Sequence, residues 1–256
     1  MPTSTKLQEQ YGDDVQVIFV ECQGTAKDVY EAFAWKMKWM GNRAMWTTER
    51  PIPTKGNGLP ETALIGVDGN VVMQGNPGDF GKKFEEAVAA EIKKSKEAPA
   101  GTPNELKKAW QLFNKGDLAG AVAECDKLAN DASATAKAEF EKRTGARIAR
   151  AKWLVDNGYA AEAEKLVAAL EKSVGTQAEL APKVAEQRKR LGAPEFASER
   201  DADKAYASFV AKVAKEKPFE DANVKKAQAI ATKYPGTKTA ARIERFVALS
   251  KVNLNK

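Results

Sequence analysis

The sequence contains no histidine, and it contains only two cysteines, which lie far apart at Cys22 and Cys125. The lack of histidine excludes Ser–His and Cys–His catalytic pairs and every histidine metal site. Two cysteines are too few for a Cys₃ or Cys₄ zinc site or for a disulfide-stabilised scaffold, and their separation excludes a C-x-x-C dithiol. We therefore expect no metal and no cofactor.

Long apolar runs are also absent. No segment approaches the roughly 18–20 apolar residues that span a bilayer. The residues after Met1 show no apolar stretch behind a charged start, as a signal peptide would. Taken from Met1, the chain is expected to be cytoplasmic and not inserted in a membrane.

The charge is unevenly distributed along the 256 residues. The whole chain carries a net charge of +6, whereas the first hundred residues carry −2 and the remainder carries +8. The second part is rich in Ala, Lys and Glu, which favour helices. Because Pro99, Gly101 and Pro103 mark a linker between the two parts, we predict domains at 1–96 and 104–256, joined by residues 97–103.

The first part alternates helix and strand signals. The nearly continuous apolar run over 14–21 predicts a strand that is buried on both faces. A helix is predicted over 26–40 from four apolar residues at helical spacing, Val29, Phe33, Met37 and Met40. A loop follows over 41–58. The dipeptide Asp68-Gly69 between 62–67 and 71–75 predicts a hairpin, and Asp79 predicts the start of a helix that runs to about residue 96. This order indicates an α/β domain.

Two stretches resemble the thioredoxin-like redoxins of bacterial envelopes. MPTSTKLQEQYGDDVQVIFVEC resembles the first helix and second strand of that family, and GLPETALIGVDGNVVMQG resembles the segment with its cis-proline and its hairpin. The resemblance implies that Pro60 is the cis-proline and that the backbone of Leu59 pairs with a peptide substrate. Without the resemblance, Leu59-Pro60 indicates a trans peptide bond in a turn that leads into a strand.

The departure from this family concerns its redox site. Members begin with a strand and a C-x-x-C motif at the start of the first helix, whereas this chain begins inside that helix, with Met1-Pro2 resembling the pair that follows the second cysteine. The missing strand would lie between the strands at 14–21 and 62–67, so two apolar edges would be exposed. We therefore expect Met1 to be an internal methionine, with a periplasmic or cell-envelope location for the longer protein.

Two features of the first part have alternative interpretations. Cys22 is either a half-buried, inert residue or a reactive thiol with Lys27 as its cationic neighbour. A cluster of Trp and Met side chains forms either a core or a hydrophobic partner surface that includes Trp39 and Trp46. The cluster comprises Trp35, Met37, Trp39, Met40, Met45 and Trp46.

The second part repeats a helix–turn–helix pattern. Hairpins are predicted over 104–129, 149–170 and 201–232, with a final helix to about residue 251. The segment AWQLFNKGDLAGA and the linker YPGT resemble tetratricopeptide-like repeats, in which stacked hairpins supply the core. Trp110, Trp153, Phe209 and Cys125 are expected in that core. The fold class is therefore an α/β thioredoxin-like domain, incomplete at its N-terminus, followed by an all-α domain of helical-hairpin repeats.

A run of basic residues in the second part raises the question of nucleic acid. Lys183, Arg188, Lys189 and Arg190 form the densest run, but acidic residues are interspersed and no aromatic residues accompany it. We expect a solvated surface and no nucleic acid. The functions that remain are a thiol–disulfide oxidoreductase relative that lacks its dithiol, a redox-inert adaptor that binds a protein or peptide, and a basic helical protein that binds an acidic partner.

Overall fold

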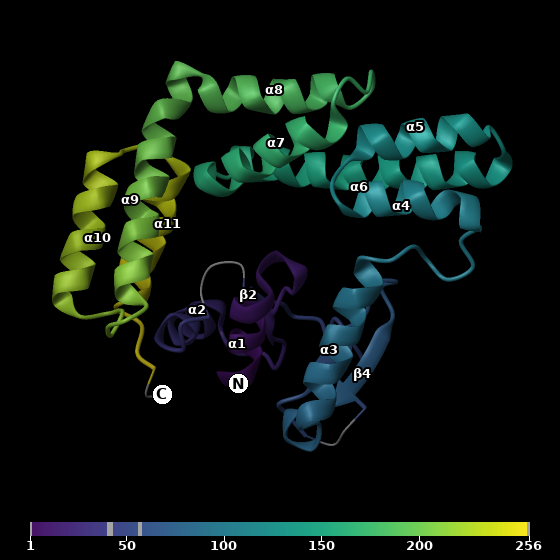
Figure 1. Ribbon diagram of the computed structural model, residues 1–256. Helices are drawn as coiled ribbons and strands as arrows, with labels where there is room; N and C mark the ends of the chain where they lie inside the picture. Colours follow the sequence, from purple (N-terminus) through teal and green to yellow (C-terminus); the bar gives the residue numbers. More distant parts are fainter. Residues whose placement is uncertain (1, 40–42, 56–57, 255–256) are drawn as a thin grey trace. The chain divides into compact units, whose positions relative to one another are not determined.

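The computed structural model describes residues 2–39, 43–55 and 58–254. Met1 and Met40, which enter the sequence interpretation, lie outside these residues. The chain divides into two compact units, one formed by Met1–Ala34 and Trp39–Thr102, the other by Trp35–Lys38 and Pro103–Lys256 (Figure 1). The first is called the α/β unit and the second the helical unit. None of the helices in the described ranges has the length and apolar composition that a bilayer crossing requires.

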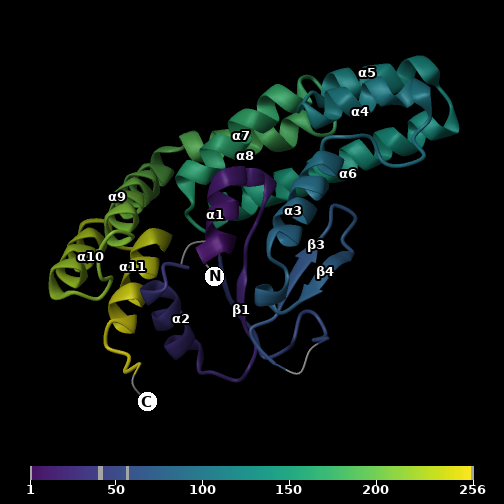
Figure 2. The ribbon, with the colours of Figure 1, turned by 60° about the horizontal axis from the view of Figure 1, so that its bottom comes forward.

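The α/β unit alternates helices with short strands (Figure 2). Its elements are α1 (Pro2–Tyr11), the 3₁₀ turn η1 (Gly12–Asp14), β1 (Phe19–Glu21), α2 (Lys27–Lys36), β2 (Ala44–Trp46), β3 (Thr62–Ile65), β4 (Val71–Gly75), the 3₁₀ turn η2 (Pro77–Asp79) and α3 (Lys82–Ser95).

The strands form two separate pairs among the described residues. β1 and β2 run parallel, with Val20 opposite Met45, while β3 and β4 are antiparallel, with Leu64 opposite Met73. The turn between β3 and β4 contains Gly69 at a φ of 82°, a backbone conformation that glycine adopts readily. The hairpin predicted from Asp68-Gly69 is therefore confirmed.

Several element predictions in this unit are wrong. The strand expected over 14–21 is restricted to Phe19–Glu21, and it is not buried on both faces, because Ile18 and Val20 are exposed. The predicted loop over 41–58 contains β2. The helix expected from Asp79 begins at Lys82, because the chain first forms η2, in which the Asn76 side chain accepts a hydrogen bond from the Gly78 N–H.

The apolar face predicted for the second helix is also wrong. Phe33 and Met37 are exposed, whereas Tyr30 and Ala34 are buried. Tyr30 and Ala34 are about one helical turn apart, as Phe33 and Met37 are, but Ala34 lies one residue after Phe33. The buried face is therefore rotated by one residue from the predicted face. The face that packs is the one that meets β1 and β2.

The helical unit is a series of helices in which α4 to α8 and α9 to α11 alternate in direction, and the chain turns sharply between α8 and α9 (Figures 1 and 2). Its elements are the 3₁₀ turn η3 (Asn104–Leu106), α4 (Lys107–Asn114), α5 (Leu118–Leu128), α6 (Asp131–Asp156), α7 (Ala160–Val174), α8 (Ala181–Gly192), the 3₁₀ turn η4 (Pro194–Phe196), α9 (Ala197–Val213), α10 (Asp221–Lys233) and α11 (Lys238–Leu249). Successive helices pack on each other from α4 to α8 and again from α9 to α11, with η4 between α8 and α9, and the contacts α5–α7, α6–α8 and α7–α9 extend the stack.

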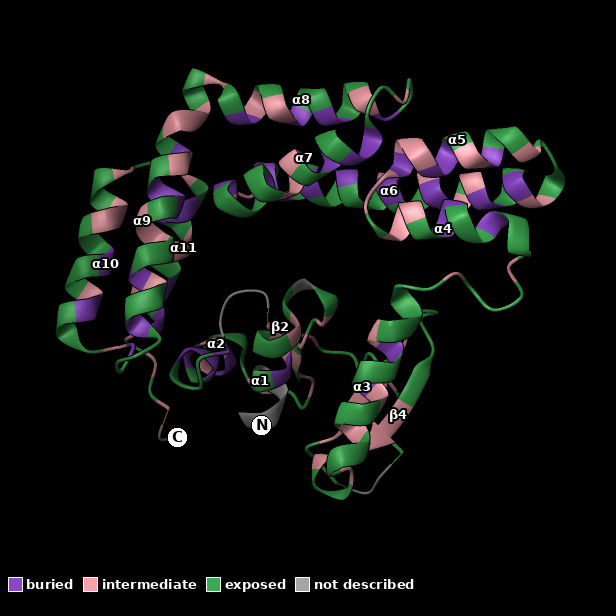
Figure 3. Cartoon of the chain, viewed as in Figure 1, coloured by how far each residue is buried: buried purple, intermediate pink, exposed green. Residues whose placement is uncertain are grey.

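Buried residues of this unit lie where helices face each other (Figure 3). Phe140, Phe209 and Phe246 are fully buried and carry much of the core. The predicted hairpin at 104–129 is confirmed as α4 and α5. The hairpin predicted from residue 149 is wrong at its start, because α6 is continuous from Asp131, where Asn130 and Ser133 form a capping box.

Candidate functional site

The segment predicted to contact a peptide lies just before β3. The Leu59–Pro60 peptide bond is cis, the isomer that the redoxin resemblance implies, and the Leu59 side chain is exposed. The next residue, Glu61, accepts hydrogen bonds at Oε1 from the Lys55 N–H and from Nε2 of Gln74, both at 2.9 Å. Glu61 therefore ties the preceding loop to β4, a role for which the sequence contains no motif.

Trp39 and Trp46 do not form an exposed partner surface. Trp39 is 8% exposed, and its ring stacks on Phe19 with the ring centres 4.2 Å apart. Trp46 is half-buried, and its Nε1–H donates to the Thr25 carbonyl at 2.7 Å. Tyr30 joins them, donating from its hydroxyl to the Phe19 carbonyl at 2.6 Å, and burial raises the pKa of this phenol. The interpretation of this cluster as a core holds for these two side chains.

The two thiols lie in different units and are both free. Cys22 is half-buried at the end of β1, beside Glu21, whose Oε1 accepts from the N–H groups of Gln23 and Thr25. Over the ranges that the structure describes, no group of three or more Cys, Asp and Glu side chains is placed to hold a metal ion.

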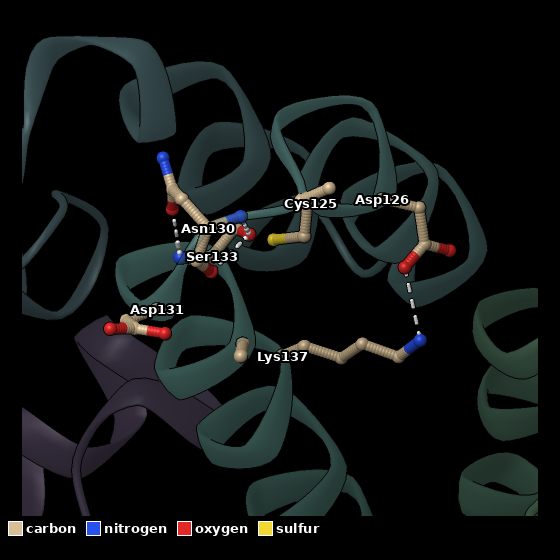
Figure 4. A pocket seen from close by; sticks show the side chains of 8 residues that line it. Cys125, Asp126, Asn130, Asp131, Ser133 and Lys137 are labelled. Carbon is tan, nitrogen blue, oxygen red and sulfur yellow. Dashed lines mark hydrogen bonds and ion pairs between the residues drawn. The ribbon is translucent and has the colours of Figure 1, made fainter.

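Cys125 belongs to the core of the helical unit, as predicted. It is 1% exposed beside a hollow of about 340 Å³ at the turn between α5 and α6 (Figure 4). Burial raises the pKa of this thiol, which favours its neutral form over the reactive thiolate. Four of the polar residues around the hollow pair with one another: Asn130 accepts from the Ser133 N–H at 2.8 Å, and Asp126 pairs with Lys137 at 3.0 Å.

The basic run on α8 is partly neutralised by carboxylates. Arg188 donates two hydrogen bonds to Glu171, at 2.8 and 2.6 Å, and Arg190 pairs with Asp156 at 2.6 Å. These pairs agree with a mixed-charge surface rather than a continuous basic stripe.

A buried polar junction holds α7, α9 and α11 together, and sequence reasoning did not find it. Glu199 on α9 accepts hydrogen bonds from the N–H groups of Lys238 and Thr239, at 2.7 and 2.9 Å, and thereby caps α11. One turn later on α9, Asp203 accepts from the Ala161 N–H at 3.0 Å, at the start of α7. Negative charge near a helix N-terminus is favourable, so each carboxylate stabilises the helix that it contacts.

Arg242 completes this junction. It pairs with Asp203 at 3.0 Å and donates to the Gly158 carbonyl at 2.9 Å. Its guanidinium lies 4.1 Å from the ring centre of Tyr159 and 5.1 Å from that of Tyr206, which are cation–π distances. Burial raises the pKa of Tyr206 to about 12. The partners of Arg242 lie far apart in the chain, so no local pattern could have revealed them.

Trp153 is the residue whose predicted place differs most from the structure. It was expected in the core, but it is 54% exposed on the outer side of α6. Its indole stacks on Tyr159, with ring centres 5.5 Å apart. Comparison of the chain with protein-family models, with curated proteins and with solved structures finds no match.

Proposed function

We propose that the chain is a thioredoxin-like protein of the redoxin type, related to the thiol–disulfide oxidoreductases of cell redox homeostasis, with no dithiol in this sequence and with a helical-repeat unit that binds a protein or peptide partner. The observation that carries the first part is the order of the α/β unit. Helix α2 connects the parallel strands β1 and β2. The antiparallel hairpin β3–β4 and helix α3 follow them in the chain.

Open strand edges support the same proposal. Among the described residues β1 and β3 each pair with one strand only, and Ile18, Val20, Ile65 and Val67 are exposed on or beside them. Isolated two-stranded sheets are marginal in water, and apolar edges invite pairing. These properties suit an α/β unit whose sheet is one strand short, which is what the resemblance implies.

The stack of helices supports the proposal that the helical unit binds a protein or peptide partner. Stacked hairpins build extended surfaces on which repeat proteins bind other proteins. The redoxin resemblance that underlies the α/β assignment also favours the periplasm or the cell envelope as the location.

A second candidate is a redox-inert adaptor, and the state of the thiols favours it. Cys22 and Cys125 are both free, and Cys125 is buried with a raised pKa. A dithiol cycle needs two thiols that can form a disulfide with each other, and this chain has no vicinal pair.

Reduction of insulin disulfides in the presence of dithiothreitol tests redox activity. We expect the purified chain to give no rate above dithiothreitol alone, and we expect Cys22→Ser to behave identically, because no vicinal dithiol is present. Cys125→Ser serves as the matched control. Turnover that Cys22→Ser abolishes would show that Cys22 is a reactive thiol and would contradict the adaptor function.

A further inference from the structure

Trp153 presents a large aromatic surface to solvent on the helical unit. It is 54% exposed, whereas the other four tryptophans are buried or half-buried. A tryptophan can bury up to about 250 Å² of surface, so leaving one exposed forgoes a large hydrophobic gain. Exposed tryptophans are also enriched among the residues that dominate binding energy at protein interfaces.

The indole of Trp153 packs, through Tyr159, against the polar junction formed by Glu199, Asp203 and Arg242. It stacks on Tyr159 with an angle of 17° between the rings, and the guanidinium of Arg242 lies over the same tyrosine. Asp203 and the Gly158 carbonyl fix Arg242 in turn. An aromatic side chain whose orientation is already fixed loses little conformational entropy when a partner binds.

Small residues surround Trp153 on α6. Ala146 and Ala149 precede it by two turns and one turn, and both are exposed. Ala149 also lines a hollow of about 270 Å³ between α6 and α8. At Gly145, in the same hollow, an added Cβ would meet nothing within 4 Å, so packing inside the chain does not explain this glycine. The surface next to Trp153 therefore has room for a partner side chain.

Positive charge predominates around this surface. Arg150 lies one turn before Trp153, and Lys152 and Lys183 line the hollow together with one carboxylate, Glu186. Arg150 and Lys183 are exposed and make no ion pair with any described residue. The Asp156 carboxylate pairs with Lys152 and Arg190, and the Asp203 carboxylate pairs with Arg242. The charge that complements this surface is negative.

We propose that Trp153 is the anchor of a docking surface for an acidic segment of a partner protein. An apolar side chain of the segment lies on Trp153 and on the alanines before it, and its carboxylates reach Arg150 and Lys183. This inference rests on the proposed partner-binding function of the helical unit and specifies the site and the chemistry of the partner.

The test is selection of peptides from a displayed library of random linear peptides on the full chain. We expect the selected peptides to be acidic and to contain an aromatic or large aliphatic residue. Trp153→Ala is expected to weaken their binding by about tenfold or more, and Arg150→Gln more modestly. Raising the NaCl concentration from about 50 to about 300 mM is expected to weaken binding as well, because salt screens exposed charges. Phe33→Ala, which removes another exposed aromatic residue, is the matched control and should leave binding unchanged.

The outcomes separate this inference from the function on which it rests. Selected peptides that are neutral or basic, or that bind Trp153→Ala as well as the unaltered chain, would overturn the docking surface but leave partner binding intact. A selection that retains no peptide would overturn both. Sedimentation as a dimer that Trp153→Ala converts to a monomer would assign the surface to a second copy of the chain, and would also overturn the proposal.

Discussion

Gly158 shows how a single residue determines the packing at the junction between α6 and α7. Its φ is 73°, and a Cβ atom added there would lie 2.5 Å from Oε1 of Glu199 and 2.9 Å from Cβ of Lys238. The first contact would displace the carboxylate that caps α11. Gly236 has a similar φ of 77°, but nothing lies within 4 Å of the position of its Cβ.

Alanine substitutions at Gly158 and Gly236 separate two contributions to the free energy of unfolding, the cost of a left-handed backbone and the cost of a steric clash. We expect Gly236→Ala to lower the free energy of unfolding of the helical unit by about 1–2 kcal/mol, the cost of a left-handed alanine. We expect Gly158→Ala to lower it by about 3 kcal/mol or more, because the clash with Glu199 is added. Urea titration followed by circular dichroism measures both values. Equal losses would show that the contact with Glu199 relaxes at no cost.

At the scale of secondary-structure elements, α9 stabilises two other helices through side chains one turn apart. The Glu199 carboxylate receives the first N–H groups of α11, and the Asp203 carboxylate receives an N–H of α7. By contrast, Asp117 caps its own helix, α5, by accepting from the Gly120 N–H at 2.8 Å. A cap supplied from another helix couples the two helices, whereas a local cap does not.

Glu199→Ala tests this coupling by amide hydrogen exchange. We expect the Lys238 and Thr239 amides to lose protection, and the stability of the helical unit to fall by about 2 kcal/mol, because one partly buried and one buried donor lose their acceptor. Asp117→Ala is the control, and its effect should be confined to the first turn of α5. Unchanged protection at Lys238 and Thr239 in Glu199→Ala would refute the cap.

An element that neighbouring residues specify can be predicted from the sequence, whereas an element that depends on contacts with distant residues cannot. The β3–β4 hairpin and the α4–α5 hairpin are specified by nearby residues, Asp68-Gly69 and the turn at Gly116, and both form as predicted. β2 has three residues in a segment rich in turn-forming residues, and it exists because it pairs with β1. No property of residues 44–46 alone identifies them as a strand.

At the scale of the whole molecule, each of the two units contains one thiol, so the accessibility of each thiol depends on the folding of its own unit. Cys22 is half-buried in the α/β unit, whereas Cys125 is buried in the helical unit and its pKa is raised by that burial. The unfolded chain releases the Cys125 proton at a lower pH than the folded chain does. This residue therefore favours the fold below the ordinary thiol pKa, and the stability it contributes is lost as the pH rises above that value.

Thiol labelling with a chromogenic disulfide reagent checks this difference. In the native chain we expect one thiol, Cys22, to react promptly, and we expect Cys125 to react only after the helical unit unfolds, because labelling needs an accessible thiolate. Raising the pH from about 7 to about 9 should leave Cys125 protected. In Cys22→Ser the native labelling should disappear. Prompt labelling of Cys125 in that variant would contradict its burial.

The sequence by itself determined what depends on composition and on neighbours in the chain. It excluded histidine chemistry and a C-x-x-C dithiol, placed the hairpin turns, and predicted the burial of Cys125 from the helical spacing of its neighbours. The tertiary structure decided which residues meet across long separations. It buried Trp39, exposed Trp153, and brought Arg242 to Asp203 and Tyr159, because these outcomes depend on which helix faces pack together rather than on any local pattern.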